Sequence, residues 1–254
     1  MRLHILSDLH NEFEIYQPLD VDAAVIVLAG DIDIGARSFS WARQQWPSQT
    51  ILFVAGNHEY YGCSDLAEVQ EEMRAAAERY QIQFLENGVF EHEGVRFLGT
   101  SLWTDFSLFG AGEAAERAMD HARNGINDFR RIRTGDGQRL TPEDAVAFNT
   151  QARNFLRTEL AKAFDGKTVV ITHWLPHPNA VAPRFRGDRL SPYFCCDCRD
   201  IMADFKIDLW IFGHSHGSTD FEDASGCRVF SNQKGYPHER PDDCGFDPVC
   251  IVRI

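Results

Sequence analysis

Hydrophobic residues in this chain gather in short runs, and most of these runs stop at a glycine or a polar residue. Short runs of aliphatic and β-branched residues are typical of strands that are buried on both faces. Between the runs, turn residues such as Asn87-Gly88 and Glu93-Gly94 mark reversals of the chain. The pattern predicts strands over residues 3–7, 23–29, 50–55, 167–172 and 209–212, with further strands inside 83–99 and 219–254.

Helices are predicted between these runs by apolar residues at helical spacing. Ser64 is the expected N-cap of one helix, and Thr141 with Asp144 is expected to form a capping box in another. Residues 100–140 have no clear period and are expected to form an insertion over one end of the sheet. No repeat or linker divides the chain, so a single domain, 1–254, is expected. The predicted helices cover about 38–46, 64–80, 141–160 and 196–205.

Polar side chains follow the predicted strands at the point where each strand ends. If the chain stays extended there, residues two apart point to the same side. Each strand end taken alone could be an ordinary turn. In open α/β architectures, however, ligands bind beyond the carboxyl ends of the strands, so we expect these side chains to converge. They are Asp8 and His10, Asp31, Asn57 and His58, His173, and His214 and His216.

These groups suggest a metal centre. Together they offer more carboxylate, amide and imidazole groups than one divalent ion needs, and a suitable number for two. Asp31 has two oxygens and a central position among the strands, so it is the natural bridge between two ions. The set contains no thiolate, which suits Mn²⁺, Fe²⁺ or Zn²⁺ better than Mg²⁺.

The order of these motifs resembles that of the calcineurin-like metallophosphoesterase superfamily. The motifs are Asp8-x-His10, Gly30-Asp31, Gly56-Asn57-His58-Glu59, His173 and Gly213-His214-x-His216, and they span nearly the whole chain. The resemblance implies an α/β fold, a four-layer α-β-β-α sandwich of two mixed β-sheets flanked by helices. It implies a dinuclear metal site at the carboxyl ends of the strands, with the insertion over it. By the same resemblance, one ion is bound by Asp8, His10, Asp31 and His216, and the other by Asp31, Asn57, His173 and His214.

This constellation predicts an enzyme that hydrolyses a phosphoester, either a small-molecule phosphodiester or a phosphomonoester. Two ions about 3.5–4 Å apart can clamp a phosphoryl group and share a bridging hydroxide, which attacks phosphorus. His58 is not a ligand in the family pattern, and it is expected to donate a proton to the leaving oxygen. His58 and Asp31 are therefore the expected catalytic residues, and Glu59 is a candidate for orienting His58.

Several other residues near these motifs are candidates for substrate contacts, although each could equally belong to the core or the surface. They are Tyr60, Trp103, Trp174, His177 and Arg184. Tyr61 is expected to be a core or surface residue without a substrate contact. Cys195, Cys196 and Cys198 contain one C-x-x-C spacing without a second pair, and reduced thiols in a helix are expected there rather than a zinc site.

The net charge of −13 argues against a general nucleic-acid binder and against docking on anionic membranes. No apolar run reaches the roughly 20 residues of a membrane span, and the N-terminus lacks the pattern of a secretory signal, so a cytoplasmic location is expected.

The alternatives to a small-molecule phosphoesterase are a nuclease or a protein phosphatase on the same fold, and a non-catalytic metal-binding scaffold. A protein phosphatase is disfavoured because Asp31 is followed by Ile32-Asp33-Ile34-Gly35, without the arginine usual there.

Overall fold

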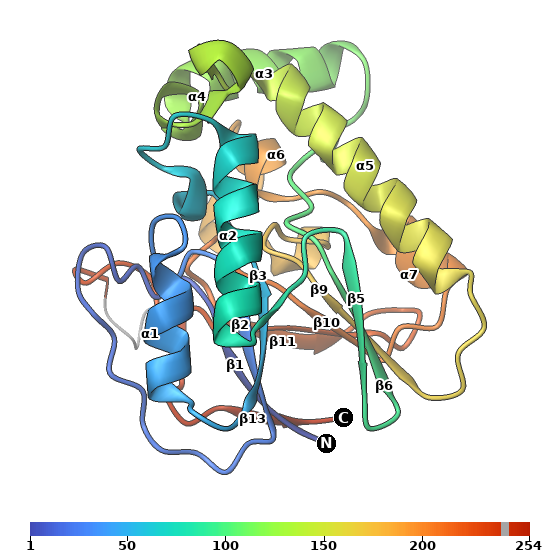
Figure 1. Ribbon diagram of the computed structural model, residues 1–254. Coiled ribbons are helices and arrows are strands. Elements are labelled where there is room, and N and C mark those ends of the chain that lie inside the picture. Colours follow the sequence, from blue (N-terminus) through green and yellow to red (C-terminus); the bar gives the residue numbers. More distant parts are fainter. Residues whose placement is uncertain (240–243) are drawn as a thin grey trace.

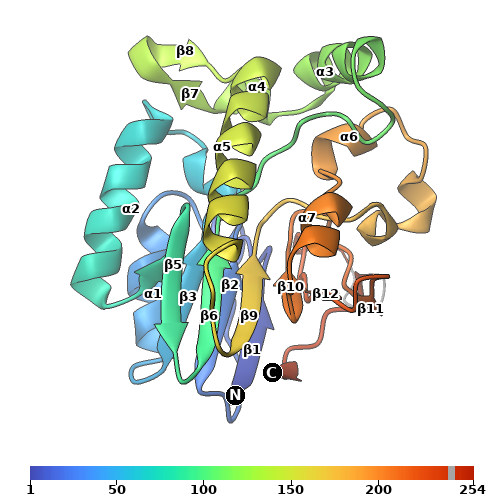
Figure 2. The same cartoon turned by 90° about the vertical axis from the view of Figure 1, so that its right-hand side faces the viewer.

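The computed structural model describes residues 1–239 and 244–254, and its two main β-sheets pack face to face between helices (Figures 1 and 2). The first sheet has the strand order β13-β1-β2-β3-β4 and the second β11-β12-β10-β9-β6-β5. The strands of the first are β1 (Arg2–Leu6), β2 (Val25–Ala29), β3 (Thr50–Val54), β4 (Gln83–Phe84) and β13 (Ile251–Arg253). Those of the second are β5 (Gly88–His92), β6 (Val95–Gly99), β9 (Lys167–Ile171), β10 (Leu209–Ile211), β11 (Thr219–Glu222) and β12 (Arg228–Ser231).

Both sheets are mixed. Strands β1 to β4 run parallel, and β13 joins them antiparallel. In the second sheet β6, β9, β10 and β12 are parallel, with β5 and β11 antiparallel at the edges. The carboxyl ends of the parallel strands therefore gather at one end of the sandwich, the upper end in Figure 1. The chain termini lie side by side at the opposite end, where Met1 and Ile254 exchange hydrogen bonds of 2.8 and 3.1 Å.

Residues of the central strands alternate between two buried layers, which explains why these strands are mainly apolar. In β2, Val25 and Val27 belong to the core between the two sheets. Their neighbours Ile26 and Leu28 belong to the outer core beneath the helices. A strand that is buried on both faces cannot show the polar alternation of a surface strand.

The helices cover the outer faces of the sheets. The first sheet is covered by α1 (Arg37–Gln45) and α2 (Leu66–Tyr80), and the second by α5 (Pro142–Leu160) and α7 (Arg199–Asp204) (Figures 1 and 2). The predicted four-layer α-β-β-α sandwich is thus confirmed. None of the helices in the described residues is long and apolar enough to cross a membrane.

Details of the helices differ from the sequence predictions in two places. The capping box of Thr141 and Asp144 is confirmed. The N-cap of α2 is Asp65 instead of Ser64, because the Asp65 carboxylate accepts the N–H of Ala67 at 2.7 Å. Helix α7 begins after Cys196 and Cys198, which were expected inside it. Together with Cys195, both are buried in the segment between α6 (Ser191–Phe194) and α7.

Residues 100–140 form regular structure that the sequence pattern did not indicate. They contain α3 (Glu113–Gly125), α4 (Asp128–Arg131) and a short hairpin of β7 (Arg133–Thr134) and β8 (Gln138–Arg139). These elements lie beyond the carboxyl ends of the strands (Figure 1). The buried residues of α3 are only Ala118 and Ala122, so the apolar signal of this helix is weak.

Candidate metal centre

Side chains from several strand ends meet at the upper end of the sandwich. Three groups bring ligand atoms within 4.8 Å of one another: Asp8, His10 and His216; His10, Asp31 and His58; and Asp31, His173 and His214. Nearly all of these side chains are buried. In the described part of the chain, no such group includes a cysteine.

The backbone at these strand ends is left-handed instead of extended. The φ angles of Asp8, His10, Asp31, His214 and His216 are 54°, 51°, 56°, 80° and 52°. The sequence argument from a continued extended strand was therefore wrong, although its side chains do meet. Non-glycine residues in this region are uncommon and are often found at functional sites, where the surrounding structure holds them in place.

Glycines beside these residues let the loops approach one another closely. A Cβ atom on Gly56 would lie 2.2 Å from Asp31 Oδ1 and 2.7 Å from His173 Nε2. A Cβ atom on Gly213 would lie 2.8 Å from Asp8 Oδ2. These positions leave no room for a side chain without displacing a candidate ligand.

Asp31 stands at the centre and directs its two carboxylate oxygens to different neighbours. Oδ1 is 3.4 Å from His173 Nε2 and accepts the His58 N–H at 2.8 Å. Oδ2 is 3.9 Å from His10 Nε2 and 4.0 Å from His58 Nε2. This arrangement fits a carboxylate that serves two neighbouring ions.

The surroundings of His173 fit a cation. Its Nδ1 lies 2.8 Å from the carbonyl oxygen of Ala29, which can only accept, so Nδ1 must donate. In a neutral ring the lone pair of Nε2 then faces Asp31 Oδ1 at 3.4 Å and Asn57 Oδ1 at 3.3 Å. Acceptors that face one another in a buried site need a positive charge between them. His214 Nε2 is also buried without a hydrogen-bond partner among the described residues.

A second group of acceptors lies on the other side of Asp31. His10 Nε2 and His216 Nε2 are 3.0 Å apart, and Asp8 Oδ1 is 3.6 Å from His216 Nε2. The Nδ1 atoms of the two rings lie 3.1 and 2.6 Å from the carboxylates of Glu12 and Glu239. Such carboxylate partners hold a histidine with its other nitrogen free to bind a metal. The residues therefore fit a cation here as well.

The pKa values of Asp31 and of the histidines around it depend on one another. Burial opposes ionisation of Asp31, but the nearby His173 and His58 hold its pKa well below the ordinary value. Burial also opposes the charged form of His173, yet the negative Asp31 raises the pKa of His173 to about 9. Without metal, protonated histidines thus supply the positive charge that the buried carboxylate requires.

The partners of His58 differ from the sequence expectation. Glu59 does not orient His58, because its carboxylate accepts backbone N–H groups of Asp31, Ile32 and Gly56 at 3.0, 2.8 and 2.7 Å. It therefore ties the loops that carry Asp31 and Asn57 together. Burial and repulsion by Asp31 raise the pKa of Glu59 to about 8.

Glu12 is the residue that contacts His58, with Oε1 2.6 Å from His58 Nδ1. On the other side of the ring, the Tyr236 hydroxyl lies 3.2 Å from His58 Nε2. Burial lowers the pKa of His58, but Asp31 and Glu12 outweigh it and raise that pKa to about 9. In the sequence, the one indication of a role for Glu12 is its position two residues after His10.

Asp128 of α4 orients the Asn57 amide. Its Oδ1 accepts Asn57 Nδ2 at 3.1 Å and the Tyr61 hydroxyl at 2.5 Å, and its Oδ2 accepts the Tyr193 hydroxyl. With its nitrogen held in this way, Asn57 turns its oxygen toward His173. Asp128 lies in the segment without a clear sequence pattern, and no motif marked it.

Most of the expected substrate contacts lie in the core. Tyr60, Trp103 and Trp174 are at most 4% exposed, and the indole rings of Trp103 and Trp174 stack 4.4 Å apart. His177 is buried, accepts the Asn179 N–H and caps a short helix. None of these four side chains lines the cavity over the centre.

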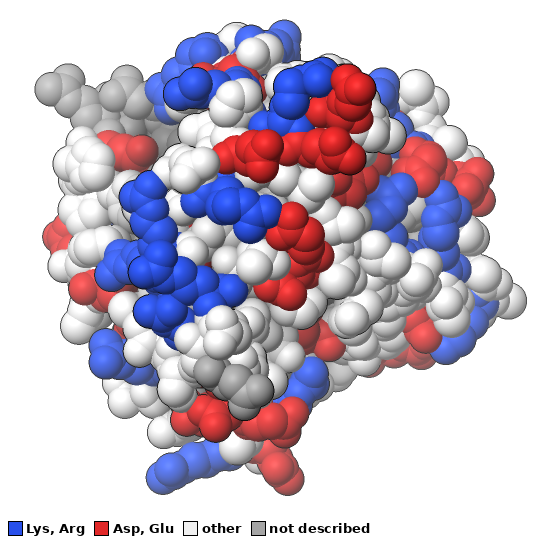
Figure 3. Space-filling model, turned by 90° about the horizontal axis from the view of Figure 1, so that it is seen from above, with Lys and Arg blue, Asp and Glu red and all other residues white. Residues whose placement is uncertain are grey.

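A cavity of about 290 Å³ opens over the centre. Arg184 is the one expected substrate residue that lines it. Tyr61, for which no substrate contact was expected, lines it too. The face of the molecule at this end carries Lys and Arg side chains gathered in one part, with acidic groups beside them (Figure 3). The other residues of the lining are Asp31, Asn57, His58, Gly125, Ile126, Asn127, Asp128, Phe185, Tyr193, Phe194, His214, Ser215, His216, Tyr236 and Glu239.

The fold and this centre agree with a known family. The profile of the calcineurin-like phosphoesterases matches residues 1–218. The match spans most of the chain, so the protein belongs to the calcineurin-like phosphoesterase family and is a metal-dependent hydrolase of phosphoesters. The resemblance that the sequence motifs carried is confirmed.

Individual relatives are distant. The uncharacterised protein L509 of Acanthamoeba polyphaga mimivirus is 24% identical over 225 residues, which make up 80% of this chain and 73% of the viral protein. A phosphopantetheinyl hydrolase from Mycobacterium tuberculosis has a TM-score of 0.70 at 18% identity, over 92% of this chain and 89% of that one. A dimetal phosphatase from Danio rerio has a TM-score of 0.54 at 14% identity, over 95% and 89% of the two chains. At these identities the solved structures establish the likeness of fold.

Proposed function

We propose that the protein is a dinuclear enzyme that hydrolyses a small-molecule phosphoester. The observation that carries this proposal is the placement of acceptor atoms on both sides of Asp31. Asp8, His10 and His216 would hold one ion with Asp31, and Asn57, His173 and His214 would hold the other. Bound divalent ions supply Lewis-acid polarisation of a phosphoryl group and a water of lowered pKa. The mixed oxygen and imidazole donors favour Mn²⁺, Fe²⁺ or Zn²⁺.

His58 would act as the general acid of this reaction. Its Nε2 lies 4.0 Å from Asp31 Oδ2, and the residue lines the cavity over the centre. In the metal-free protein, Asp31 and Glu12 raise the pKa of this ring, which favours its protonated form. The ring can then give its Nε2 proton to the leaving alcohol oxygen, while Glu12 holds its orientation through Nδ1.

A small substrate is supported by the size of the cavity and by the charge of the chain. A volume of about 290 Å³ matches the lower end of the range for small-molecule sites. The net charge of −13 disfavours extended nucleic acid, which leaves a nuclease or a protein phosphatase as the weaker candidates. Arg184 at the cavity is suited to an anionic group of the substrate.

The proposal is tested with a panel of phosphomonoesters and phosphodiesters, supplied with Mn²⁺, Fe²⁺ or Zn²⁺. Hydrolysis of at least one small ester is expected, and His58→Ala should lower turnover about 100-fold or more while metal stays bound. Asp31→Asn should reduce the bound metal as well. Retention of full turnover by Asp31→Asn, or no reaction with any ester and any ion, would overturn the proposal.

A further inference from the structure

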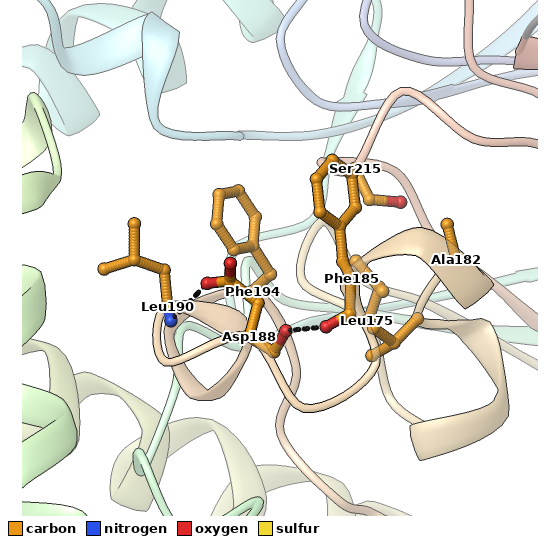
Figure 4. Close-up of a pocket in the computed structure, with 9 residues that line it drawn as sticks. Leu175, Ala182, Phe185, Asp188, Leu190, Phe194 and Ser215 are labelled. Carbon is orange, nitrogen blue, oxygen red and sulfur yellow. Dashed lines mark hydrogen bonds between the residues drawn. The ribbon is translucent and has the colours of Figure 1, made fainter.

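A second cavity, of about 250 Å³, lies beside the first and is lined almost entirely by apolar side chains (Figure 4). The two cavities share Phe185, Phe194 and Ser215 as lining residues. We propose that this apolar pocket receives the organic group of the substrate, so that the enzyme acts on phosphoesters of apolar alcohols. The inference rests on the proposed function and names the substrate class of the same site.

The walls come from the long segment after β9 and from the end of β10. Figure 4 shows the rings of Phe185 and Phe194 extending in the same direction, with Leu190 on the far side of Phe194. Ser215 lies next to the Phe185 ring in this view. The lining consists of Leu175, Val181, Ala182, Phe185, Asp188, Leu190, Ser191, Phe194 and Ser215.

Each polar residue of the lining already has a hydrogen bond within the protein. Asp188 Oδ1 accepts the backbone N–H two residues later at 2.8 Å. The Ser191 hydroxyl donates to the carbonyl oxygen of Phe185 at 2.6 Å, and the Ser215 N–H donates to Gln233 Oε1 at 2.8 Å. A ligand therefore gains little from hydrogen bonds here, whereas burying apolar surface is favourable.

The pocket adjoins the metal centre directly. Ser215 stands between the candidate ligands His214 and His216, and the Phe194 ring lies 5.0 Å from the His214 ring at an interplanar angle of 35°. An ester with its phosphoryl group at the centre thus has its organic group next to these walls. Phe185 is 44% exposed at the junction, and an exposed aromatic beside a concave site is typical of ligand contact.

The residues shared by the two cavities favour a small molecule over a partner protein as the occupant of the pocket. A partner protein would meet the metal cavity as well as the pocket, whereas a single small molecule can occupy both, because the two share three lining residues. The polar cavity and the apolar pocket then match the two ends of an ester, a phosphoryl group and a carbon chain or ring. Ala182 lies in the lining with a small side chain, and a larger residue there would occupy the pocket.

The test compares alkyl phosphates from ethyl to octyl by release of inorganic phosphate, together with the corresponding alkyl 4-nitrophenyl diesters. We expect kcat/KM to rise with chain length by up to about fourfold per methylene group, until the pocket is filled. Phe185→Ala, which removes one wall, and Ala182→Phe, which fills the space, should each lower the octyl-to-ethyl ratio at least about tenfold. Phe109→Ala removes a similarly exposed phenylalanine, 51% exposed, outside both linings and should leave the ratio unchanged.

Failure of this inference and failure of the proposed function give different results. Equal kcat/KM for ethyl and octyl esters, or a ratio that neither pocket variant changes, would overturn the inference and leave the phosphoesterase in place. Binding supplies the second readout, since octylphosphonate cannot be hydrolysed. Calorimetry should show it binding more tightly than ethylphosphonate, and Ala182→Phe should remove the difference. Tighter octylphosphonate binding without hydrolysis of any ester would support the pocket while overturning the proposed reaction.

Discussion

The carboxylate of Glu12 accepts a hydrogen bond from His58, with Oε1 2.6 Å from Nδ1. The same oxygen lies 3.1 Å from Nδ1 of His10, a candidate metal ligand. One carboxylate therefore orients both the proposed general acid and a ligand of the centre. Hydrogen bonds from His10 and His58 outweigh the effect of burial on Glu12 and lower its pKa to about 2, so it stays ionised at neutral pH.

Glu12→Gln should lower kcat about 10- to 100-fold, as substitutions of residues that orient metal ligands commonly do. The change also removes a negative charge that raises the pKa of His58. The alkaline limb of the rate–pH profile should therefore move to lower pH. Glu14→Gln, an exposed neighbour, is the matched control. An unchanged kcat and pH profile in Glu12→Gln would show that Glu12 does not position His58.

Gly56→Ala should damage the centre although it replaces no candidate ligand. Its Cβ would lie 2.2 Å from Asp31 Oδ1, so Asp31 or the Asn57 loop must shift. We expect metal affinity to fall about 10- to 100-fold, measured by the metal content of purified protein. Gly135→Ala is the control, because the nearest atom to its Cβ would be 3.8 Å away. Normal metal content in a folded Gly56→Ala variant would contradict this account of the close approach.

Glu86, which is not among the candidate ligands, should make the free energy of unfolding depend on pH. Its carboxylate accepts the Ser101 hydroxyl at 2.6 Å, and burial raises the pKa of Glu86 to about 7. The folded state thus binds a proton more readily than the unfolded state, whose glutamate pKa is near 4.5. The stabilisation is complete below about pH 4.5 and is lost as pH rises through about 7.

Urea unfolding at a series of pH values measures this contribution. Between about pH 4.5 and 7, the free energy of unfolding of the wild type should fall relative to that of Glu86→Gln. Glu91→Gln, an exposed residue of β5, should follow the wild type. Parallel curves for the wild type and Glu86→Gln would mean that the folded pKa of Glu86 is ordinary.

The sandwich was predictable because its central strands are buried on both faces and consist mainly of apolar residues. The candidate ligands were predictable because each stands directly after such a run. The backbone conformation that brings these ligands together was not predictable, because the left-handed φ angles at Asp8 and His214 depend on contacts with other loops. Asp128 and Phe194 were missed because they reach the site from segments without a regular pattern, and only the folded chain brings those segments to the strand ends.

Titration of the metal-free protein with Mn²⁺ is the sharpest test of whether two ions in one centre hydrolyse a phosphoester. Bound metal per chain is measured together with hydrolysis of p-nitrophenyl phosphate and its bis-ester. For a dinuclear centre, we expect no hydrolysis without metal, and hydrolysis that becomes maximal as a second ion binds. Hydrolysis that persists after removal of all metal, or that is complete with one ion per chain, would contradict this expectation.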